Sequence, residues 1–313
     1  MTAPDPVPSP SVPGADGAPS LRRVVAAAGD LLADAGVPSA HHDAAALAAF
    51  VLGVPRFEPA LAGLEPAGFR ARYAEVVERR RRREPLQHIV GEAGFRHVVL
   101  AVEPGVFVPR PETESVAQRA VDEAAAVAAS GRPPLVVDLC CGAGGIAVSV
   151  AFEVPAARVV AVDLSAQAVA LTGRNADRAG VRPERLVVAD ATADDVLADL
   201  EGAVDVVVAN PPYIPPDAVP LDAEVRDHDP DLALYGGGAD GLLVPRGVVR
   251  TAARLLRTGG LLVMEHAEVQ ASAARAMADG AFEDITTGTD LTGRDRMLLA
   301  RRSGRAVVRD SPS

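Results

Sequence analysis

The sequence contains no lysine, because all 31 of its basic residues are arginines. A Walker-A phosphate loop, a kinase active site and a Schiff-base enzyme each depend on a lysine amine. The absence therefore excludes these three classes of active site, whatever compositional drift produced it.

Cysteine and histidine are too few or too scattered for a metal centre. The two cysteines, Cys140 and Cys141, are adjacent and cannot build a disulfide framework or a zinc site. The six histidines show no His-x-x-x-His or comparable spacing. We therefore expect no metal cofactor.

Long apolar runs are also missing. No stretch approaches the roughly 18 uninterrupted apolar residues of a membrane-spanning helix, and the first residues lack the pattern of a signal peptide. We expect a cytoplasmic globular protein of 313 residues, 49% of them apolar, with no membrane partner. Its net charge of −11 disfavours nucleic acid as a partner, because duplex binding relies on a basic face.

The chain divides into segments of different composition. Residues 1–20 are rich in proline and predict a disordered tail, as do residues 303–313. Residues 21–84 carry apolar residues at helical spacing and predict a small helical domain. The last of its helices ends in five arginines, residues 79–83. We expect a solvated helix end there rather than a contact with an acidic partner.

Residues 85–110 predict a β-hairpin that links two domains. Its expected strands are residues 97–102 and 106–108, separated by the turn Glu103-Pro104-Gly105. Residues 111–302 then alternate between helical segments and short apolar strands. The predicted strands are residues 135–139, 158–163, 185–189, 204–209 and 261–265. This alternation is typical of an α/β fold with a doubly wound parallel sheet.

A glycine-rich loop follows the first of these strands. Gly142-x-Gly144-x-x-Ala147 fits the dinucleotide fingerprint, and Asp163 ends the next strand, where its carboxylate can accept both hydroxyls of a ribose. The loop suits NAD and S-adenosylmethionine alike. It therefore predicts a nucleotide cofactor without choosing between them, and a purely structural tight turn is the alternative.

Two further acids favour S-adenosylmethionine. Asp138 stands at the end of the first strand and could meet the cofactor's amino group directly or through water. Asp190 follows the third strand and could accept a hydrogen bond from the adenine amino group. The alternative role for Asp190 is to cap a helix over residues 192–200.

The segment Asn210-Pro211-Pro212-Tyr213 follows the fourth strand, at the sheet edge where such folds bind ligands. An ordinary turn also uses Asn and Pro, but it does not require a Tyr. The Asn210 side-chain oxygen and the Pro211 carbonyl can each accept one N–H of a planar amino group, while Tyr213 packs on its π-face. These hydrogen bonds favour pyramidalisation and drain developing positive charge. The motif therefore predicts amino-group methylation.

Several segments together make the chain resemble the release factor glutamine methyltransferase family, within the class I S-adenosylmethionine methyltransferases. They are Pro85–Gly91, Phe107–Glu114, Asn210–Ile214, Ala233–Gly237 with Asp240–Leu242, and Gly293–Arg296. The resemblance runs over about residues 21–302. It implies a helical substrate-recognition domain, a linking hairpin and a methyltransferase domain over residues 111–302 with a Rossmann-like, mainly parallel seven-stranded sheet. It also implies N5-methylation of a glutamine in the Gly-Gly-Gln loop of peptide chain release factors, the expected protein partners.

The resemblance also implies roles for individual residues. Asn210, Pro211 and Tyr213 are the expected catalytic residues, and together with Pro212 they are expected to bind the substrate amide. The expected cofactor-binding residues are Asp138, Cys140, Gly142, Ala143, Gly144, Asp163, Asp190, Ala191, Asn210, Phe107 and Thr113. For Phe107 and Thr113 the alternative is packing of the hairpin on the next helix.

The sequence departs from the family pattern in three places. Cys140 replaces the first glycine of the loop Asp-Leu-Gly-x-Gly-x-Gly, so we expect its Cβ to crowd the cofactor or to need a positive φ. Ala191 stands where an aromatic residue is common, and His228-Asp229-Pro230 has histidine in place of an aromatic residue. Cys141 is interpreted as a small loop residue, with a redox switch as the alternative. These departures predict a divergent branch.

Four rival functions stay open at this point. A sister enzyme could methylate a glutamine of a ribosomal protein, or the substrate could be the amino group of a nucleic-acid base. A non-catalytic binding protein could have lost cofactor affinity through Cys140 and Ala191. NAD-linked reduction is the most remote, because the sequence shows no constellation for hydride transfer.

Overall fold

The computed structural model describes residues 20–58 and 66–304. The chain forms two compact units, Met1–Ile89 and Val90–Ser313. The expected tails lie almost entirely outside the described residues. Ser20, Ser303 and Gly304 are the exceptions. Ser303 corrects the expected boundary, because it is buried and its backbone N–H donates to Ala281 O over 3.0 Å.

The first unit is helical, as predicted. Its helices are α1 (Leu21–Asp34), α2 (Ala40–Leu52), α3 (Phe69–Arg81) and α4 (Leu86–Val90), the last of which ends at the boundary between the units. Leu32, Leu47 and Phe69 are fully buried. The Tyr73 hydroxyl donates to Ala44 O over 2.9 Å, which ties α3 to α2.

The arginine run at the end of α3 corrects one expectation. Arg80 is only 5% exposed, and its Nε donates to the buried Asp43 Oδ2 over 2.7 Å. Arg81 and Arg82 stay near the surface and pair with Glu78. The prediction of a solvated helix end is therefore wrong for Arg80, because a buried guanidinium is stable only beside a buried acid.

The second unit begins with a small antiparallel sheet of β1 (Glu92–Phe95) and β2 (Val98–Ala101). The predicted hairpin is therefore only half right, since the partner of β2 precedes it and residues 106–108 form no strand. The turn falls at Arg96, whose φ is 51°. Val106–Val108 does not pair because its donors are used elsewhere. Val108 N–H points to Asp229 Oδ1, 3.4 Å away, and Val106 N–H donates to Glu103 O.

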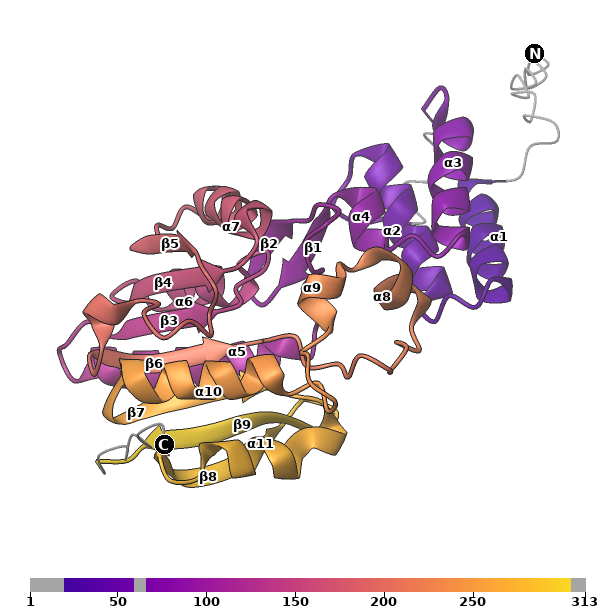
Figure 1. Cartoon of the computed structure of the whole chain (residues 1–313). Helices are drawn as coiled ribbons and strands as arrows, with labels where there is room; N and C mark the ends of the chain where they lie inside the picture. Colours follow the sequence, from indigo (N-terminus) through magenta and orange to yellow (C-terminus); the bar gives the residue numbers. More distant parts are fainter. Residues whose placement is uncertain (1–19, 59–65, 305–313) are drawn as a thin grey trace, which may run out of the picture. The chain divides into compact units, whose positions relative to one another are not determined.

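The large sheet has seven described strands in the order β5-β4-β3-β6-β7-β9-β8 (Figure 1). They are β3 (Leu135–Leu139), β4 (Arg158–Asp163), β5 (Arg185–Val188), β6 (Val204–Ala209), β7 (Leu256–Glu265), β8 (Phe282–Thr289) and β9 (Asp295–Arg302). Strand β9 runs antiparallel to both β7 and β8, and the remaining pairs are parallel. The predicted mainly parallel α/β sheet is confirmed.

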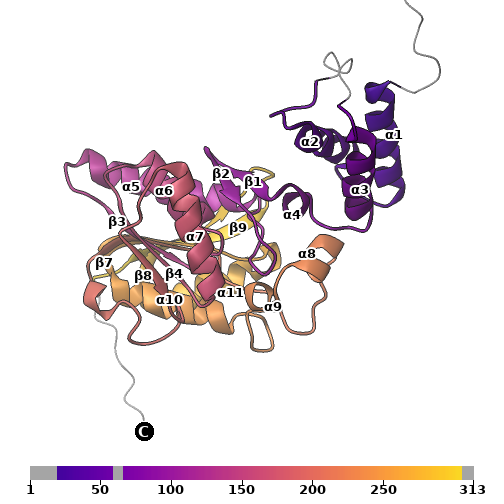
Figure 2. The ribbon, with the colours of Figure 1, turned by 90° about the horizontal axis from the view of Figure 1, so that it is seen from above.

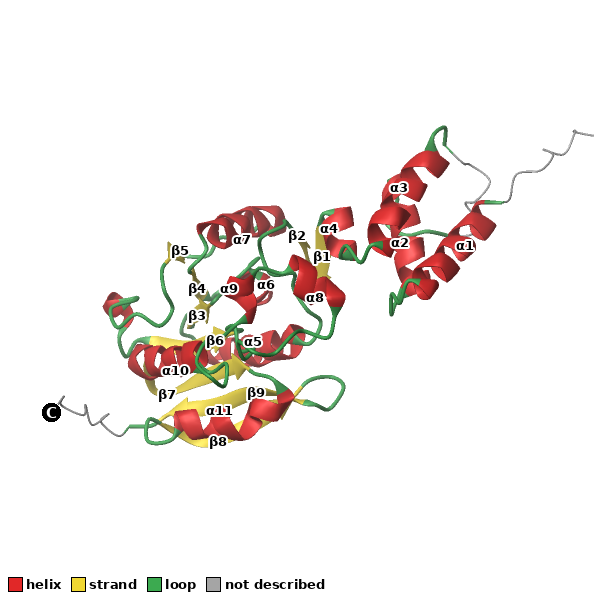
Figure 3. Cartoon of the chain, turned by 45° about the vertical axis from the view of Figure 1, so that its right-hand side comes forward, coloured by secondary structure: helices red, strands yellow, loops and turns green. Residues whose placement is uncertain are grey.

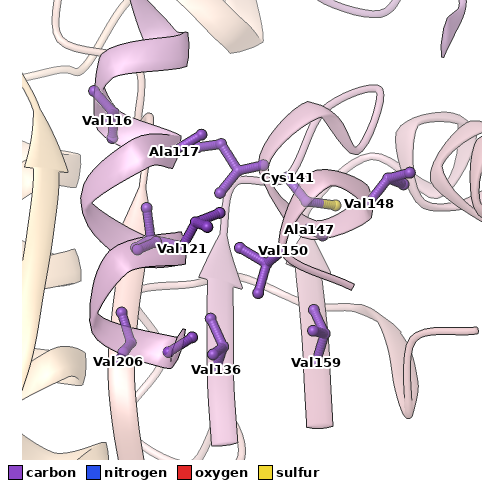
Figure 4. Packing of buried hydrophobic residues seen from close by; sticks show 14 of the residues in the cluster. Val116, Ala117, Val121, Val136, Cys141, Ala147, Val148, Val150, Val159 and Val206 are labelled. Carbon is purple, nitrogen blue, oxygen red and sulfur yellow. The ribbon is translucent and has the colours of Figure 1, made fainter. Parts of the chain in front are cut away.

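Helices cover both faces of this sheet (Figures 1 and 2). One face carries α5 (Thr113–Ala129), α6 (Gly145–Glu153) and α7 (Ala166–Ala179), and the other carries α10 (Leu243–Leu255) and α11 (Ala271–Ala278). Because successive strand residues point to opposite faces, Val136 packs under α5 and α6 (Figure 4) while Val137 packs on the other side. Two buried faces explain the continuous apolar strands.

The connection between β6 and α10 carries the short helices α8 (Ala223–His228) and α9 (Asp231–Leu234) (Figure 3). The helix expected over residues 192–200 is largely absent, since these residues form turns and one 3₁₀ helix, Ala198–Leu200. A second 3₁₀ helix, Glu268–Gln270, precedes α11. Over residues 20–58 and 66–304, every helix is too short or too polar to cross a lipid bilayer.

Candidate active site

A cavity of about 750 Å³ opens at the carboxyl ends of the parallel strands. It lies where β3 and β6 are neighbours and the strand order reverses, which is the usual ligand position in doubly wound sheets. Of the residues predicted from the sequence, the wall contains Phe107, Thr113, Cys140, Gly142, Ala143, Asp163, Asp190, Ala191 and Asn210 to Tyr213. Asp138 and Gly144 are not in the wall.

The loop between β3 and α6 has the backbone that its sequence demands. Cys140 adopts a φ of 66°, so the expectation of a left-handed residue at this departure from the family pattern is confirmed. Gly142 N–H donates to Asp163 Oδ2 over 2.8 Å, and Ser165 N–H donates to the other oxygen over 2.8 Å. Burial raises the pKa of Asp163. This carboxylate therefore shapes the loop while also lining the cavity.

Asp138 lies beneath the loop. It is fully buried, and its Oδ2 accepts the Ala147 N–H over 3.0 Å, whereas no described group bonds Oδ1. Burial raises the pKa of Asp138 to about 8. Asp138 was expected to meet the cofactor's amino group directly or through water, and it lies outside the cavity wall. The unpaired oxygen leaves it able to bind a water or an amino group.

Gly144 and Cys141 both contact Thr172 of α7, and of the two only Cys141 also lines the cavity. Gly144 has a φ of 86°, and a Cβ there would lie 2.8 Å from Thr172 Cγ2, so only glycine fits. Cys141 Sγ lies 3.5 Å from Thr172 Oγ1, and burial raises the pKa of this thiol well above its usual value. A thiol of this kind reacts slowly, which favours a packing role for Cys141 over a redox switch.

Asp190 and Ala191 lie after β5. Asp190 Oδ1 accepts both the backbone N–H and the hydroxyl of Thr192, over 2.8 and 2.7 Å. The carbonyl of Ala191 accepts the Thr251 hydroxyl over 2.8 Å. Asp190 thus caps a turn, and it also lines the cavity.

These groups fit a nucleoside cofactor with an amino acid tail. Asp163 and Asp190 end neighbouring strands and present carboxylates to the same cavity. The glycine loop keeps side chains small beside them, and the Phe107 ring supplies an apolar wall. The two carboxylates are acceptors, which suits the hydroxyl donors of a ribose and the amino donor of an adenine.

Asn210 is oriented by a chain of hydrogen bonds that begins on β7. Its Nδ2 donates to Thr113 Oγ1 over 3.2 Å, and the Thr113 hydroxyl donates to Glu265 Oε2 over 2.8 Å. The Tyr213 hydroxyl donates to Glu265 Oε1 over 3.2 Å. Within the described residues, neither Asn210 Oδ1 nor Pro211 O has a hydrogen-bond partner. Two acceptors are therefore left for a ligand.

The backbone of this segment is held from behind. Ile214 N–H donates to Leu234 O over 2.8 Å, and Gln270 Nε2 donates to Tyr213 O over 2.8 Å. A Cβ on Gly236 would overlap Gly241 O and lie 2.5 Å from Pro212 O. The glycines of the Tyr-Gly-Gly and Asp-Gly segments are thus needed because two stretches of backbone meet here.

The Pro-Arg-Pro segment is fixed by a buried acid. The Arg110 guanidinium pairs with Asp229 and also lies over the Phe107 ring, 5.2 Å from its centre. Thr113 follows in the same segment and reaches Glu265. Thr113 lines the cavity, and its hydroxyl links the wall residue Asn210 to the buried Glu265.

Sequence reasoning missed three polar residues of the site: Glu265, Arg296 and Gln270. Glu265 is 3% exposed, and burial raises its pKa to about 7 against the opposing effects of Thr113, Arg296 and Tyr213. A signal was available, since Glu265 ends an apolar strand just as Asp163 does. Arg296 lines the cavity and belongs to Gly293–Arg296, one of the segments that carry the family resemblance.

Comparisons with known proteins identify the family of this chain. Residues 114–224 match the family described as Methyltransferase small domain, and residues 23–91 match the PrmC N-terminal domain. The release factor glutamine methyltransferase of Streptomyces coelicolor is 48% identical over 89% of this chain and 97% of its own length. That of Bifidobacterium longum is 44% identical over 88% and 98%.

A relative named for a different activity is also similar. The 4-amino-L-phenylalanine/4-methylamino-L-phenylalanine methyltransferase of Streptomyces pristinaespiralis is 41% identical over 83% of this chain and 87% of its own length. Identities of 44–48% over almost the full length of the relatives nevertheless establish the family. The chain belongs to the release factor glutamine methyltransferases.

Proposed function

We propose that this protein transfers a methyl group from S-adenosylmethionine to the side-chain amide nitrogen of the glutamine in the Gly-Gly-Gln loop of a peptide chain release factor. The observation that carries the proposal is the orientation of Asn210, whose Nδ2 is bonded to Thr113 so that Oδ1 is left to accept. The similarity of this chain to named release factor glutamine methyltransferases supports the choice of acceptor.

The acceptor amide would be held by two oxygens that lie next to each other in the chain. Asn210 Oδ1 and Pro211 O each accept one N–H, which fixes the nitrogen and favours its pyramidalisation. The nitrogen lone pair is then less delocalised into the carbonyl group and more available to the methyl group. Tyr213 supports the plane of the group while its hydroxyl is anchored to Glu265. As positive charge develops on the nitrogen, both bonds strengthen, and such charge-assisted bonds contribute about 1.5–3 kcal/mol each.

The cofactor would lie against the β3–α6 loop. S-adenosylmethionine would supply a sulfonium methyl group and leave as the neutral thioether with the bonding electron pair, while the methylated amide nitrogen would release a proton to water. Asp163 would accept from the ribose hydroxyls, Asp190 from the adenine amino group, and Cys140 to Ala143 would cover the cofactor with small side chains. The helical unit over residues 21–84 would help to recognise the protein substrate.

The test is methyl transfer from labelled S-adenosylmethionine to a purified release factor, with the modified peptide located by mass spectrometry. A release factor with Gln→Ala in the Gly-Gly-Gln loop is the matched control. We expect label on that glutamine alone. Label on a ribosomal protein or a nucleic-acid base instead would overturn the proposal, and absence of saturable cofactor binding would indicate a non-catalytic relative.

A free aromatic amine is the second candidate acceptor. It is supported by the similarity to the Streptomyces pristinaespiralis enzyme, which is named for 4-amino-L-phenylalanine. Two adjacent acceptor oxygens would suit an aryl –NH₂ as well as an amide. Competition between 4-amino-L-phenylalanine and the release factor in one assay decides between them, since the true acceptor takes up methyl with the higher kcat/KM.

A further inference from the structure

Glu265 is a polar residue beside the site for which the sequence predicted no role. It ends β7, it is almost completely buried, and each of its oxygens accepts one hydrogen bond. Thr113 of α5 donates to Oε2 and Tyr213, after β6, donates to Oε1. Three elements that are distant in sequence therefore meet at one carboxylate.

The direction of these bonds decides how the Asn210 amide is turned. When Thr113 gives its only hydroxyl proton to Glu265, its oxygen can only accept from Asn210. Asn210 must then present Nδ2 to Thr113, which is the observed contact of 3.2 Å. Its Oδ1 is left as an acceptor for the substrate amide.

We propose that Glu265 is a positioning residue that sets, through the hydroxyl of Thr113, which end of the Asn210 side-chain amide faces the substrate. This inference rests on the proposed function of Asn210. A carboxylate at position 265 holds Thr113 as a donor towards β7. A group that donates at this position frees the Thr113 proton to point at Asn210. Asn210 then turns Oδ1 towards Thr113 and its Nδ2 group towards the substrate. Because the substrate amide also carries N–H groups, two donors would face each other and no hydrogen bond could form.

The inference predicts which substitutions lower kcat and which leave it unchanged. Glu265→Gln keeps the shape, and because the Tyr213 hydroxyl still donates to the amide oxygen, the amide N–H faces Thr113. Thr113→Val removes the relay. Each substitution should lower kcat about tenfold or more. Tenfold corresponds to about 1.4 kcal/mol of transition-state stabilisation. Thr113→Ser keeps the hydroxyl and should stay close to the wild-type kcat. S-adenosylmethionine affinity should change little in all three, because the relay faces the acceptor.

Glu123→Gln is the matched control. Glu123 forms a bidentate pair with Arg301 over 2.6 and 2.7 Å and has no place in the cavity wall. Its substitution removes a partly buried carboxylate without touching the relay. We expect an unchanged kcat even if the melting temperature falls.

A pH profile separates positioning from a merely structural role. The groups that act on Glu265 are Arg296 of β9, Glu112 ahead of α5 and Tyr213, with His266 next in the chain. Protonation of Glu265 at Oε2, while Oε1 still accepts from Tyr213, should reverse the relay, so wild-type kcat should fall on the acid side of neutrality. In Glu265→Gln this acid limb should be missing, because the relay is already reversed.

A second readout does not need the acceptor. The side-chain ¹⁵N amide signal of Asn210, assigned by its loss in Asn210→Asp, should shift with pH in wild type and stay constant in Glu265→Gln. If wild type fails to methylate the release factor, the proposed function fails, yet this signal still decides the relay. A wild-type kcat in Thr113→Val, equal losses in Thr113→Ser and Thr113→Val, or a pH-insensitive Asn210 signal in wild type would each overturn the inference.

Discussion

Two loops face each other across the cavity, and they are held in place differently. Two carboxylates hold the loop after β3 by accepting hydrogen bonds from backbone N–H groups. Asp138 accepts from Ala147, at the start of α6, and Asp163 accepts from Gly142. The loop after β6 is held by groups from elsewhere in the unit, namely Thr113, Glu265 and the glycine segments.

The difference teaches how each loop is suited to its ligand. Carboxylates at the ends of β3 and β4 fix the backbone of the first loop. A fixed backbone suits the proposed cofactor, which would contact small side chains and N–H groups there. A loop that must present oxygens needs its one amide side chain turned correctly, and only partners outside the loop can enforce that. The first loop should therefore tolerate change at its surface, whereas the second should fail when a remote contact is lost.

The largest expected effect falls on the second loop. Asn210→Ala removes the side-chain acceptor that faces the substrate, so kcat should fall about 10²–10³-fold, as for loss of one group that stabilises developing charge. S-adenosylmethionine affinity should stay nearly unchanged. Parallel turnover assays and cofactor titrations measure both, and unchanged turnover would contradict the assignment of Asn210.

The next effect tests the remote support of the same loop. Gly236→Ala should destabilise the protein by about 1–3 kcal/mol through overpacking, because the new Cβ overlaps Gly241 O. The activity of the folded fraction should also drop, since Pro212 must move. Gly94→Ala is the control, because no atom lies within 4 Å of its Cβ position. Urea unfolding and kcat on both variants give the comparison, and equal behaviour of the two would refute the close-contact explanation.

A smaller effect concerns the carboxylate beneath the first loop. Asp138 has a usual pKa of 3.8 that burial raises to about 8 in the folded protein. The folded state therefore holds the proton more tightly, and this contribution to stability is present below about pH 4 and is lost as pH rises to about 8. Asp138→Asn cannot ionise, so the wild type should lose stability relative to this variant between pH 5 and 8, by more than about 1 kcal/mol.

Unfolding free energies at the two pH values, without cofactor, measure this loss. Asp217→Asn removes an exposed carboxylate and serves as the control. A constant difference between wild type and Asp138→Asn across the range would mean that Asp138 is already ionised when folded.

The smallest effect should come from Cys140. Glycine at this position relieves a left-handed conformation worth about 1–2 kcal/mol but raises the entropy of the unfolded chain by about 0.4–1 kcal/mol. Cys140→Gly should therefore stabilise the protein by about 0–1.6 kcal/mol. Cys141→Gly should destabilise it instead, because Cys141 is buried without a positive φ. Thermal unfolding of the two variants checks the contrast, and a destabilised Cys140→Gly would show that the conformation carries no strain.

The sequence predicted the central strands well and the edges poorly. Leu135–Leu139, Arg158–Asp163 and Val204–Ala209 were expected at their observed bounds, because burial on both faces leaves an apolar run. Strand β8 has the burial of an edge strand, with Thr286 and Thr289 among polar residues, so its pattern carries little signal. The first hairpin was misplaced because the apolar residues Val106–Val108 are buried without being paired.

The site divides in the same way. Residues next to a strand end, such as Asp163 and Asn210, follow from the order of strands and loops and do line the cavity. Partners that lie far apart along the chain do not follow from local patterns. Thr113 and Glu265 are separated by 152 positions, and only the packing of α5 against β7 brings them together. The roles of the individual wall residues remain predictions.

The position of β9 between β7 and β8 has a consequence for how the protein is made. The strand that carries Arg296 is the latest described strand in the chain, yet it pairs with the strand that ends in Glu265. Contacts of this kind raise the contact order and slow folding. During synthesis the first helical unit and the β3–β6 core can fold early, but a complete acceptor site must await the emergence of β9. Catalytic competence is therefore acquired late in synthesis.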